Sequence, residues 1–574
     1  MIDPNAVCFY KYRTVLPGIY MVTLPNSYMQ MNIAEFDAEG APVYSSNYYN
    51  GQKWEKKNAT RYVAISVFTV DRSEKYTANE YKELIQQTEN IGLLPWKEKE
   101  PDKVCEYLTA HQYVEEMTVG WNLGNALDSK GVEEIRGTDR ALMQEIRWGN
   151  PYITEELIDY IKEWGIHTIR IPLTWYYNTT VGEDGRIHIH PQWLARVKDV
   201  VDYAIDNEMY VIINAHHEQP MFYAGVSDAE IEGVYTAVEE VWGEIATYFK
   251  AYDEHLIFEG FNEVDNLERS WNFGEVAAEQ MNRMNQIFVD TVRSTGGNNV
   301  TRLLCVPTLL DGLDSDFLEA FEMPKDSVQD RIFIQVHTYS KIFSQSIEPL
   351  FERLEEFAVE MDAPVIIGEW GSTASYPIKE LRAVHASNFI ARAAEHGVKC
   401  IIWDNGSDYG IINRKELYNS DKEMMQAVIN GVAGEKYISQ QAYCLQGDSF
   451  VYKMPNTKTG VVEDKYWGTC TTDENGSGMS IPEGSRYCSV NVARKNDADD
   501  IWLQRILFYD EDGTYISGKE VQKIDLILEI PENARYMRVS INSPYRHITW
   551  EEYMRYFQDK NLELYICFVG ALEL

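Results

Sequence analysis

Positive charge is scarce in this sequence. Only 52 residues are Lys or Arg against 90 that are Asp or Glu, so the formal net charge is −38. A field of that sign repels the phosphates of nucleic acids and the headgroups of anionic lipids. Long hydrophobic runs are also absent, since none approaches the roughly 18 residues of a membrane-spanning helix. We therefore expect a neutral partner, with no nucleic acid bound and no membrane insertion.

Cysteine is sparse and shows no pattern. The eight Cys among 574 residues form no Cys-x-x-Cys pair and have no His partners at zinc spacing, which favours buried thiols. His216-His217-Glu218 lacks the spacing of a His-Glu-x-x-His metal helix. We expect neither a metal nor another cofactor. The opening residues 1–4 lack the basic and apolar regions of a signal peptide, so they do not indicate export.

The middle of the chain alternates short apolar runs with helical patterns, which is typical of β/α units and a parallel sheet. Helices are expected between the runs, for example over residues 191–206, 275–293 and 421–430. Eight such units close a (β/α)8 TIM barrel, which we place at residues 103–433. The eight runs cover residues 118–125, 165–173, 209–216, 256–263, 301–308, 332–339, 364–371 and 399–406.

The two flanks of the barrel repeat each other. Residues 33–43 match 506–516, residues 61–66 match 535–540, and residues 77–81 resemble 549–553. Each copy has strand patterns around a Gly-containing turn, which favours a β-sandwich module. We predict a module at 1–102, which is a truncated copy of a second one at 434–574.

These modules have two interpretations. They bind polysaccharide through exposed aromatic residues, or they are spacers whose Tyr residues are half-buried strand positions. The aromatic candidates are Tyr44, Tyr48, Tyr49, Trp54, Trp467, Trp502 and Tyr545.

Polar residues end nearly every predicted barrel strand, where the active sites of such barrels lie. Glu263 and Glu369 each close a mostly apolar run, and an isolated carboxylate there is costly unless it is paired or used. Two carboxylates facing each other without metal-ligand spacing suit glycoside cleavage. Aromatic residues, whose flat faces suit sugar rings, are expected near the same ends: Trp121, Trp148, Trp175, Tyr176, Tyr177, Tyr223, Trp271 and Trp370.

These motifs together resemble a glycoside hydrolase family 5 cellulase. Within that family they are most similar to the endo-β-1,4-glucanases that often accept xyloglucan and mixed-linkage glucan as well. The resemblance covers the whole barrel and rests on residues 120–125 (GWNLGN), 148–151 (WGNP), 169–172 (IRIP), 214–218 (NAHHE), 262–263 (NE), 336–339 (VHTY), 367–369 (IGE) and 403–406 (WDNG).

The resemblance implies a role for each matching position. Glu263 corresponds to the general acid/base and Glu369 to the nucleophile of a retaining reaction. The residues implied to frame the sugar are Asn122, Arg170, His216, Asn262, His337, Tyr339 and Trp403. We expect Arg170 and Tyr339 to keep Glu369 ionised and a drier setting to keep Glu263 protonated. The two carboxyl groups are then expected about 5 to 5.5 Å apart.

The chain departs from the family pattern at two places. Val264-Asp265 follows Glu263 where relatives often have Pro, and Trp370 follows Glu369 where Phe is commoner. Substrate choice is therefore open between glucan and another β-1,4-glycan, mannan or xylan. An alternative of another class is a non-catalytic carbohydrate-binding protein on the same barrel. Because a polymer does not enter a cell, a secreted, extracellular enzyme is expected; oligomeric state is not indicated.

Overall fold

The computed structural model describes the central part of the chain almost continuously and the flanks in segments. The central part is 108–432 without 139–140, 220, 267–269, 341–346, 377 and 379. Before it, residues 6–13, 19–23, 29–37, 41–49, 52–55, 62–69 and 92–95 are described; after it, 440–445, 450–451, 453–463, 469–472, 478–493, 502–523, 525–542, 549, 551–552, 555 and 563–570. The predicted domain borders at 102/103 and 433/434 and the repeat at 77–81 lie outside these residues.

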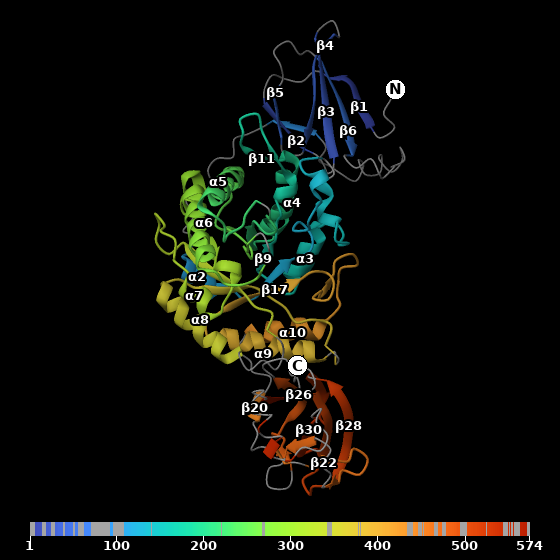
Figure 1. Ribbon diagram of the computed structural model, residues 1–574. Coiled ribbons are helices and arrows are strands. Elements are labelled where there is room, and N and C mark those ends of the chain that lie inside the picture. The colour runs from blue at the N-terminus through green and yellow to red at the C-terminus, as the bar shows by residue number, and fades with distance from the viewer. Residues whose placement is uncertain are drawn as a thin grey trace. The chain divides into compact units, whose positions relative to one another are not determined.

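Eight parallel strands form a closed barrel (Figure 1). Each of the eight apolar runs contains one of them, so the predicted TIM barrel is confirmed. The strands are β8 (Gly120–Leu123), β9 (Thr168–Ile171), β12 (Tyr210–Asn214), β13 (Leu256–Glu259), β14 (Leu304–Pro307), β15 (Ile332–His337), β16 (Val365–Trp370) and β17 (Lys399–Asp404).

The strand register brings distant polar residues to one level of the barrel. Trp403 of β17 lies opposite Asn122 of β8, and Asn122 lies opposite Arg170 of β9. On the other side, Asn214 pairs with Glu259, and His337 pairs with Glu369 across a register shift. Hydrogen bonding between neighbouring strands therefore collects the strand-end residues at the same edge of the sheet.

Helices follow the strands as expected, and their ends match local signals. Helix α4 (Pro191–Asp206) has Pro at its opening turn, and α5 (Asp228–Phe249) begins with a capping box between Ser227 and Glu230. The remaining helices are α2 (Ala110–Glu116), α3 (Glu155–Glu163), α6 (Glu275–Ser294), α7 (Ser315–Glu319), α8 (Ile347–Met361), α9 (Glu380–Glu395) and α10 (Lys422–Val432). Short helical turns are η1 (Glu133–Ile135), η2 (Ala141–Ile146), η3 (Tyr176–Asn178), η4 (Gly297–Val300) and η5 (Leu309–Asp311), and two small hairpins pair β10 (Thr179–Val181) with β11 (Ile187–Ile189) and β18 (Ile412–Asn413) with β19 (Tyr418–Asn419).

The N-terminal flank contains two antiparallel sheets. One has the order β1-β6-β3-β4 and the other β5-β2-β7. Their strands are β1 (Ala6–Arg13), β2 (Ile19–Thr23), β3 (Met29–Phe36), β4 (Pro42–Tyr49), β5 (Lys53–Glu55), β6 (Tyr62–Thr69) and β7 (Gly92–Pro95).

The C-terminal flank repeats this strand order. Its sheets contain the orders β24-β30-β27-β28 and β31-β26-β29, so β24 and β26 to β31 correspond in chain order to β1 to β7. These strands are β24 (Thr469–Thr472), β26 (Ser485–Ala493), β27 (Trp502–Tyr509), β28 (Tyr515–Lys523), β29 (Asp525–Glu529), β30 (Tyr536–Asn542) and β31 (Glu563–Gly570); the region adds β20 (Gln440–Leu445), β21 (Phe450–Val451), β22 (Met454–Pro455), β23 (Val462–Glu463) and β25 (Met479–Ser480). One apolar cluster joins residues of both sheets, including Val490, Ile506, Val539 and Ile566.

The prediction that Trp54 is an exposed, polysaccharide-binding aromatic residue of the flanks is wrong. Trp54 is 1% exposed, and its indole N–H donates to the buried Glu35 at 2.9 Å, so Trp54 belongs to the core. Tyr44 is 41% exposed and remains available at a surface. Trp467, the side chain of Trp502 and Tyr545 lie outside the described residues.

Contacts among the described residues divide the chain into two units. Unit 1 is Met1–Tyr339, Glu352–Gly371 and His396–Ser420, and unit 2 is Ser340–Phe351, Ser372–Glu395 and Asp421–Leu574. Cys305 and Cys400 in unit 1 and Cys488 and Cys567 in unit 2 are buried and free, as expected for these four. In the described part of the chain, no helix has the length and apolarity needed to cross a membrane.

Within unit 2, helix α9 packs against the C-terminal β region. Leu381 and Val384 of α9 form one buried cluster with Tyr487, Cys567 and Val569, and the Tyr487 hydroxyl donates to Glu380. Replacing Leu381 by Ala is expected to lower the free energy of unfolding of unit 2 by about 2–5 kcal/mol, because a cavity is left in this cluster. Scanning calorimetry of the full chain measures the change.

The matched control is Val461→Ala, in the same unit, because Val461 is 57% exposed. Its effect is expected within about 0.5 kcal/mol. Equal stability of Leu381→Ala and the wild type would contradict a structural attachment of this region to α9.

Candidate active site

Glu369 lies at the centre of a buried polar network at the carboxyl end of β16. The Arg170 guanidinium donates to one of its carboxylate oxygens at 2.7 Å, and the Tyr339 hydroxyl donates to the other at 2.8 Å. Burial and the neighbouring Glu369 raise the pKa of Tyr339 well above its ordinary value, so its phenol remains a donor. Both oxygens of Glu369 therefore have a fixed donor that favours the carboxylate.

Arg170 is fully buried and is held by four other acceptor contacts. Its Nε and Nη2 donate to the two oxygens of Glu259 at 2.7 and 2.6 Å, and it also donates to Asn122 at 2.9 Å and Asn262 at 2.8 Å. Burial by itself lowers the pKa of Arg170, but Glu259 and then Glu369 raise it well above its ordinary value. Arg170 is thus a permanent cation beneath Glu369.

Glu259 is a residue that the strand-end pattern did not single out. It is fully buried within β13, where it also accepts from Asn214 at 2.8 Å. The sequence feature that could have identified Glu259 is its position inside the apolar run 256–261. A buried carboxylate there requires a buried partner.

Asn122 occupies a different place from the one expected. It is fully buried, its Nδ2 donates to the Gly368 carbonyl at 2.9 Å, and its Oδ1 accepts from Arg170. Both ends of its amide are therefore used inside the barrel. Asn122 supports Arg170, and direct contact of Asn122 with a sugar is not compatible with this burial.

Glu263 lies across from Glu369, with its backbone in the left-handed region at φ 44°. One oxygen of each carboxylate and a ring nitrogen of His337 lie within 4.8 Å of one another. The two carboxylates are thus nearer to each other than the roughly 6.5–9.5 Å of inverting glycosidases, which favours the retaining geometry of roughly 5–5.5 Å. The Glu263 side chain is 27% exposed, whereas that of Glu369 is 5% exposed.

The expected protonation of Glu263 is wrong for the free protein. Burial by itself raises the pKa of Glu263, but the hydrogen bond from His337 and the nearby positive charges hold it below its ordinary value. His337 Nδ1 lies 3.1 Å from Glu263 Oε1. Burial lowers the pKa of His337, yet Asp311, Glu369 and Glu263 together raise it to about 9. His337 and the other nearby positive charges together therefore lower the pKa of Glu263 by more than burial raises it. Only the tertiary structure reveals that His337 lies beside Glu263.

His216 is a neutral imidazole beside Glu369. Burial, with His217 and Arg170 adding to it, lowers the pKa of His216 well below its ordinary value. The Nδ2 of Asn214 donates to its Nδ1 at 3.2 Å, so the proton lies on Nε2, which is 4.0 Å from Glu369.

The His216 ring stacks on Trp403, with ring centroids 5.9 Å apart and an interplanar angle of 6°. Gly124 permits this position of Trp403, because a Cβ on Gly124 would lie 2.7 Å from the indole. Trp403 remains half-buried, so one part of its face is available beside the carboxylates.

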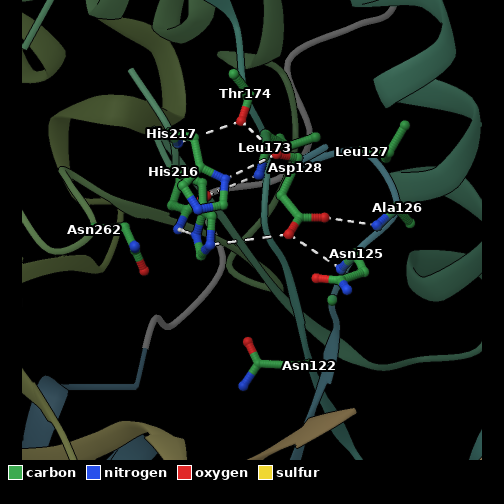
Figure 2. A network of polar contacts seen from close by, with 12 residues as sticks. Asn122, Asn125, Ala126, Leu127, Asp128, Leu173, Thr174, His216, His217 and Asn262 are labelled. Atoms are coloured by element: carbon green, nitrogen blue, oxygen red, sulfur yellow. Dashed lines mark hydrogen bonds and ion pairs between the residues drawn. The ribbon is translucent and has the colours of Figure 1, made fainter. Parts of the chain in front are cut away.

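Asp128 supports this side of the site and was not singled out by the sequence (Figure 2). Its carboxylate accepts from the backbone N–H groups of Ala126 at 2.6 Å and Asn125 at 3.0 Å, and lies 4.0 Å from His216 Nε2. Its carbonyl oxygen accepts from Thr174 at 2.8 Å. Asp128 thereby joins the ends of β8, β9 and β12.

Several aromatic residues expected to face sugar are instead core residues. Trp121, Trp175 and Trp370 are fully buried, and Tyr176 is 6% exposed. Trp148 and Trp271 are 41% and 56% exposed and fit the expectation. The position of an aromatic residue at a strand end does not reveal whether its ring points into the core or towards the cleft. Tertiary packing decides this.

A hollow adjoins Glu263. It is lined by Lys130, His216, His217, Gln219, Asn262, Glu263, Asp265 and Trp271. Asp265, one of the departures from the family pattern, is buried and accepts the backbone N–H of Trp271 at 3.1 Å, while Trp271 has φ 53°. Asp265 therefore holds an exposed indole at the edge of this hollow.

Among the described residues, three groups of side chains have the spacing of a metal site. They are Asp128 with His216 and His217, residues 253–255, and Glu263 with His337 and Glu369. The first has its carboxylate engaged by backbone amides and His217 Nδ1 within 2.9 Å of the Asp128 carbonyl. In the third group, His337 Nδ1 lies 3.1 Å from Glu263 Oε1, so hydrogen bonds already engage ligand atoms in the first and third groups.

Comparison with known proteins identifies the relatives of this chain. Residues 127–409 match the model of the family Cellulase (glycosyl hydrolase family 5). Endoglucanase B of Ruminococcus albus is 34% identical over 332 residues, which cover 54% of this chain and 77% of that protein.

Solved structures give the same result. A GH5-4 broad specificity endoglucanase from Ruminococcus champanellensis with bound cellotriose has a TM-score of 0.53 and 33% identity, covering 57% of this chain and all of that one. A glycoside hydrolase family 5 lichenase from Caldicellulosiruptor sp. F32, in complex with cellotetraose, has a TM-score of 0.52 and 33% identity, covering 59% of this chain and 99% of that one.

Proposed function

Because the chain belongs to the cellulases of glycosyl hydrolase family 5, and is thus an endoglucanase, we propose that Glu369 is its nucleophile and Glu263 its acid/base. The observation that supports this most is the pairing of the two carboxylates within 4.8 Å, with different partners on each. Arg170 and Tyr339 stabilise Glu369 as an anion, and His337 adjoins Glu263.

In the first step, a Glu369 oxygen attacks the anomeric carbon while protonated Glu263 transfers its proton to the leaving glycosidic oxygen. The C–O bond to the leaving sugar breaks, and a glycosyl-enzyme ester forms. Asn262 assists from beside Glu263. Its Oδ1 accepts from Arg170, so its Nδ2 is the end that donates to the 2-hydroxyl of the sugar.

In the second step, Glu263 acts as a base. It removes a proton from water, the resulting hydroxide attacks the anomeric carbon, and the Glu369 carboxylate leaves. Arg170 and Tyr339 stabilise the returning negative charge. The parallel His216 and Trp403 rings provide the face on which the sugar before the cleaved bond lies.

The substrate that these features favour is a β-1,4-linked glucan. The relatives with solved structures are described as a broad specificity endoglucanase and a lichenase, with cello-oligosaccharides bound. Cellulose, mixed-linkage glucan and xyloglucan are therefore the first substrates to test. Mannan and xylan are the alternatives on the same barrel.

The flanks are proposed to be two β-sandwich modules of one kind. The common strand order and the apolar cluster shared by the two C-terminal sheets support this. Tyr44 in the N-terminal copy is exposed enough to contact a polysaccharide. Since cellulose is an extracellular polymer, the enzyme is proposed to act outside the cell.

The experiment is to follow hydrolysis of cellotetraose by proton NMR and to assay a panel of glucans, mannan and xylan. The β-anomer is expected to appear first, because two displacements retain configuration. Initial release of the α-anomer would exclude Glu369 as nucleophile. Binding of glucans with no hydrolysis would favour the non-catalytic alternative.

A further inference from the structure

Asp311 is a fully buried carboxylate directly behind the proposed acid/base, at the end of η5. Its Oδ2 accepts the backbone N–H of Glu263 at 2.6 Å. Asp311 and the preceding Leu310 have φ values of 51° and 58°, in the left-handed region. The Thr308 hydroxyl, which donates to the Gly312 carbonyl at 2.6 Å, closes this unusual turn. The surrounding structure thus holds Asp311 in a strained conformation, as is common at functional sites.

The second oxygen of Asp311 faces His337. Asp311 Oδ1 lies 3.7 Å from His337 Nε2, just beyond hydrogen-bond length. Both atoms are buried, and within the described residues neither has a hydrogen-bond partner. Gly368 leaves room on this side of the ring, since a Cβ there would lie 3.2 Å from Nε2. Two unpaired buried polar atoms of complementary type therefore face each other.

The opposite nitrogen of the same ring faces Glu263. Nδ1 lies 3.1 Å from Glu263 Oε1 and 3.8 Å from Glu369 Oε2. The Asp311 carboxylate is consequently linked to Glu263 in two ways. Its Oδ2 accepts the backbone N–H of Glu263, and its Oδ1 faces His337, which contacts the Glu263 carboxylate.

We propose that Asp311 is a positioning residue that keeps a proton on Nε2 of His337, so that Nδ1 of His337 exchanges a proton with Glu263. This inference rests on the proposed acid/base role of Glu263. A carboxylate that orients an imidazole and fixes its tautomer is a general device for proton transfer.

Proton transfer between His337 and Glu263 then balances both steps of the reaction. In the first step, the Nδ1 proton of the imidazolium moves to Glu263 Oε1, and Glu263 then passes this proton to the leaving oxygen and becomes a carboxylate again. His337 becomes neutral with its remaining proton on Nε2, facing Asp311. In the second step, Glu263 takes a proton from water and passes one back to Nδ1. Glu263 is thus a carboxylate in the free protein and still an acid when substrate is bound.

The charge on His337 is set by groups from four elements. Asp311 of η5, Glu263 after β13 and Glu369 of β16 are anions around it, and neutral His216 after β12 lies in the same network. Burial raises the pKa of Asp311 to about 7, so Asp311 is ionised in the alkaline range where His337, with a pKa of about 9, loses its proton. Asp311→Asn removes this anion and lowers the pKa of His337.

The test compares Asp311→Asn with the wild type on two substrates of the full chain. With cellotetraose, whose leaving oxygen needs a proton, kcat/KM is expected to fall by about ten- to a hundredfold. With dinitrophenyl cellobioside, whose leaving group departs as an anion, kcat/KM is expected to change less than about threefold, because this constant reports the first step. The alkaline limb of the pH profile for cellotetraose is expected to move down by about one to three pH units.

The matched control is Glu145→Gln. Glu145 is another fully buried carboxylate that accepts a backbone N–H, from Ile153 at 2.5 Å, and it pairs with Arg196. It touches neither Glu263 nor His337 in any described contact. Glu145→Gln is expected to lower thermal stability. The ratio of the kcat/KM values for the two substrates and the pH profile are expected to stay unchanged. The positioning role would be overturned if Asp311→Asn lowered kcat/KM equally for both substrates and left the alkaline limb of the pH profile unmoved.

A measurement without substitution covers the case in which Asp311→Asn does not fold. Nitrogen-15 NMR of labelled histidine in the wild type is expected to show one imidazole, absent from the His337→Asn spectrum, that stays protonated above pH 8, roughly two units beyond an ordinary His. Titration of that ring near its ordinary pKa would overturn the inference. Inactivity of the wild type on both substrates would instead refute the proposed function, so the two failures are distinguishable.

Discussion

Replacing Glu369 by Gln is expected to reduce kcat/KM for cellotetraose by at least about 10⁴-fold. The amide is nearly the same size as the carboxylate but does not form the glycosyl-enzyme ester. Folding is expected to persist, because Arg170 keeps its bidentate contact with Glu259 at 2.7 and 2.6 Å. The measurement is hydrolysis of cellotetraose, with circular dichroism and thermal unfolding recorded on the same preparation.

Two further measurements sharpen this result. Glu369→Gly with added azide is expected to form α-glycosyl azide from an aryl β-cellobioside with an activated leaving group, because the anion takes the place of the missing carboxylate and only one displacement occurs. The control Glu240→Gln removes a carboxylate of an exposed ion pair with Arg186 and is expected to retain wild-type rates. A Glu369→Gln enzyme with more than about a tenth of wild-type activity would refute Glu369 as nucleophile.

The second large effect concerns stability. Replacing Arg170 by Met is expected to lower the free energy of unfolding of the barrel by about 3–5 kcal/mol, because two buried carboxylates then lack their cation. Arg170 and Glu259 have fully buried side chains, and that of Glu369 is 5% exposed. Urea unfolding followed by tryptophan fluorescence reports this loss, since Trp121, Trp175 and Trp370 are buried in the barrel.

A double replacement separates lost attraction from unpaired charge. Arg170→Met with Glu259→Leu is expected to be more stable than Arg170→Met alone, because one of the uncompensated carboxylates is removed. The control Arg186→Gln breaks an exposed ion pair whose Arg side chain is 60% exposed, and is expected to cost less than about 1 kcal/mol. Unchanged stability of Arg170→Met would contradict the structural importance assigned to this network.

Much of the barrel was predictable because parallel strands buried on both faces must be apolar throughout. The runs around Val211 and Ile366 show this, and both residues are buried in the barrel strands. The polar strand ends were equally predictable, since their positions follow from the strands themselves. Glu263, Glu369, Arg170 and Tyr339 meet at one place for that reason.

The flanking repeat was visible in fragments, and the structure extends it. Only residues 33–43, 61–66 and 77–81 matched their partners by sequence. The strand order of both regions agrees over seven strands, including β2 and β26, where no sequence match was found. Strand pairing tolerates many side chains, so the pattern of pairing outlasts the resemblance of residues.

The barrel and its family were predictable from the amino-acid sequence alone, and the two glutamates were candidates from it, because apolar periodicity and strand-end motifs are local properties of the chain. Tertiary structure alone decided which groups surround them. Asp311 is 48 residues from Glu263, and His337 is 74 residues from it, yet both touch Glu263. The pKa of a carboxyl group depends on charges within a few ångströms, whatever their distance along the chain, so the charge state of Glu263 followed only from the folded site.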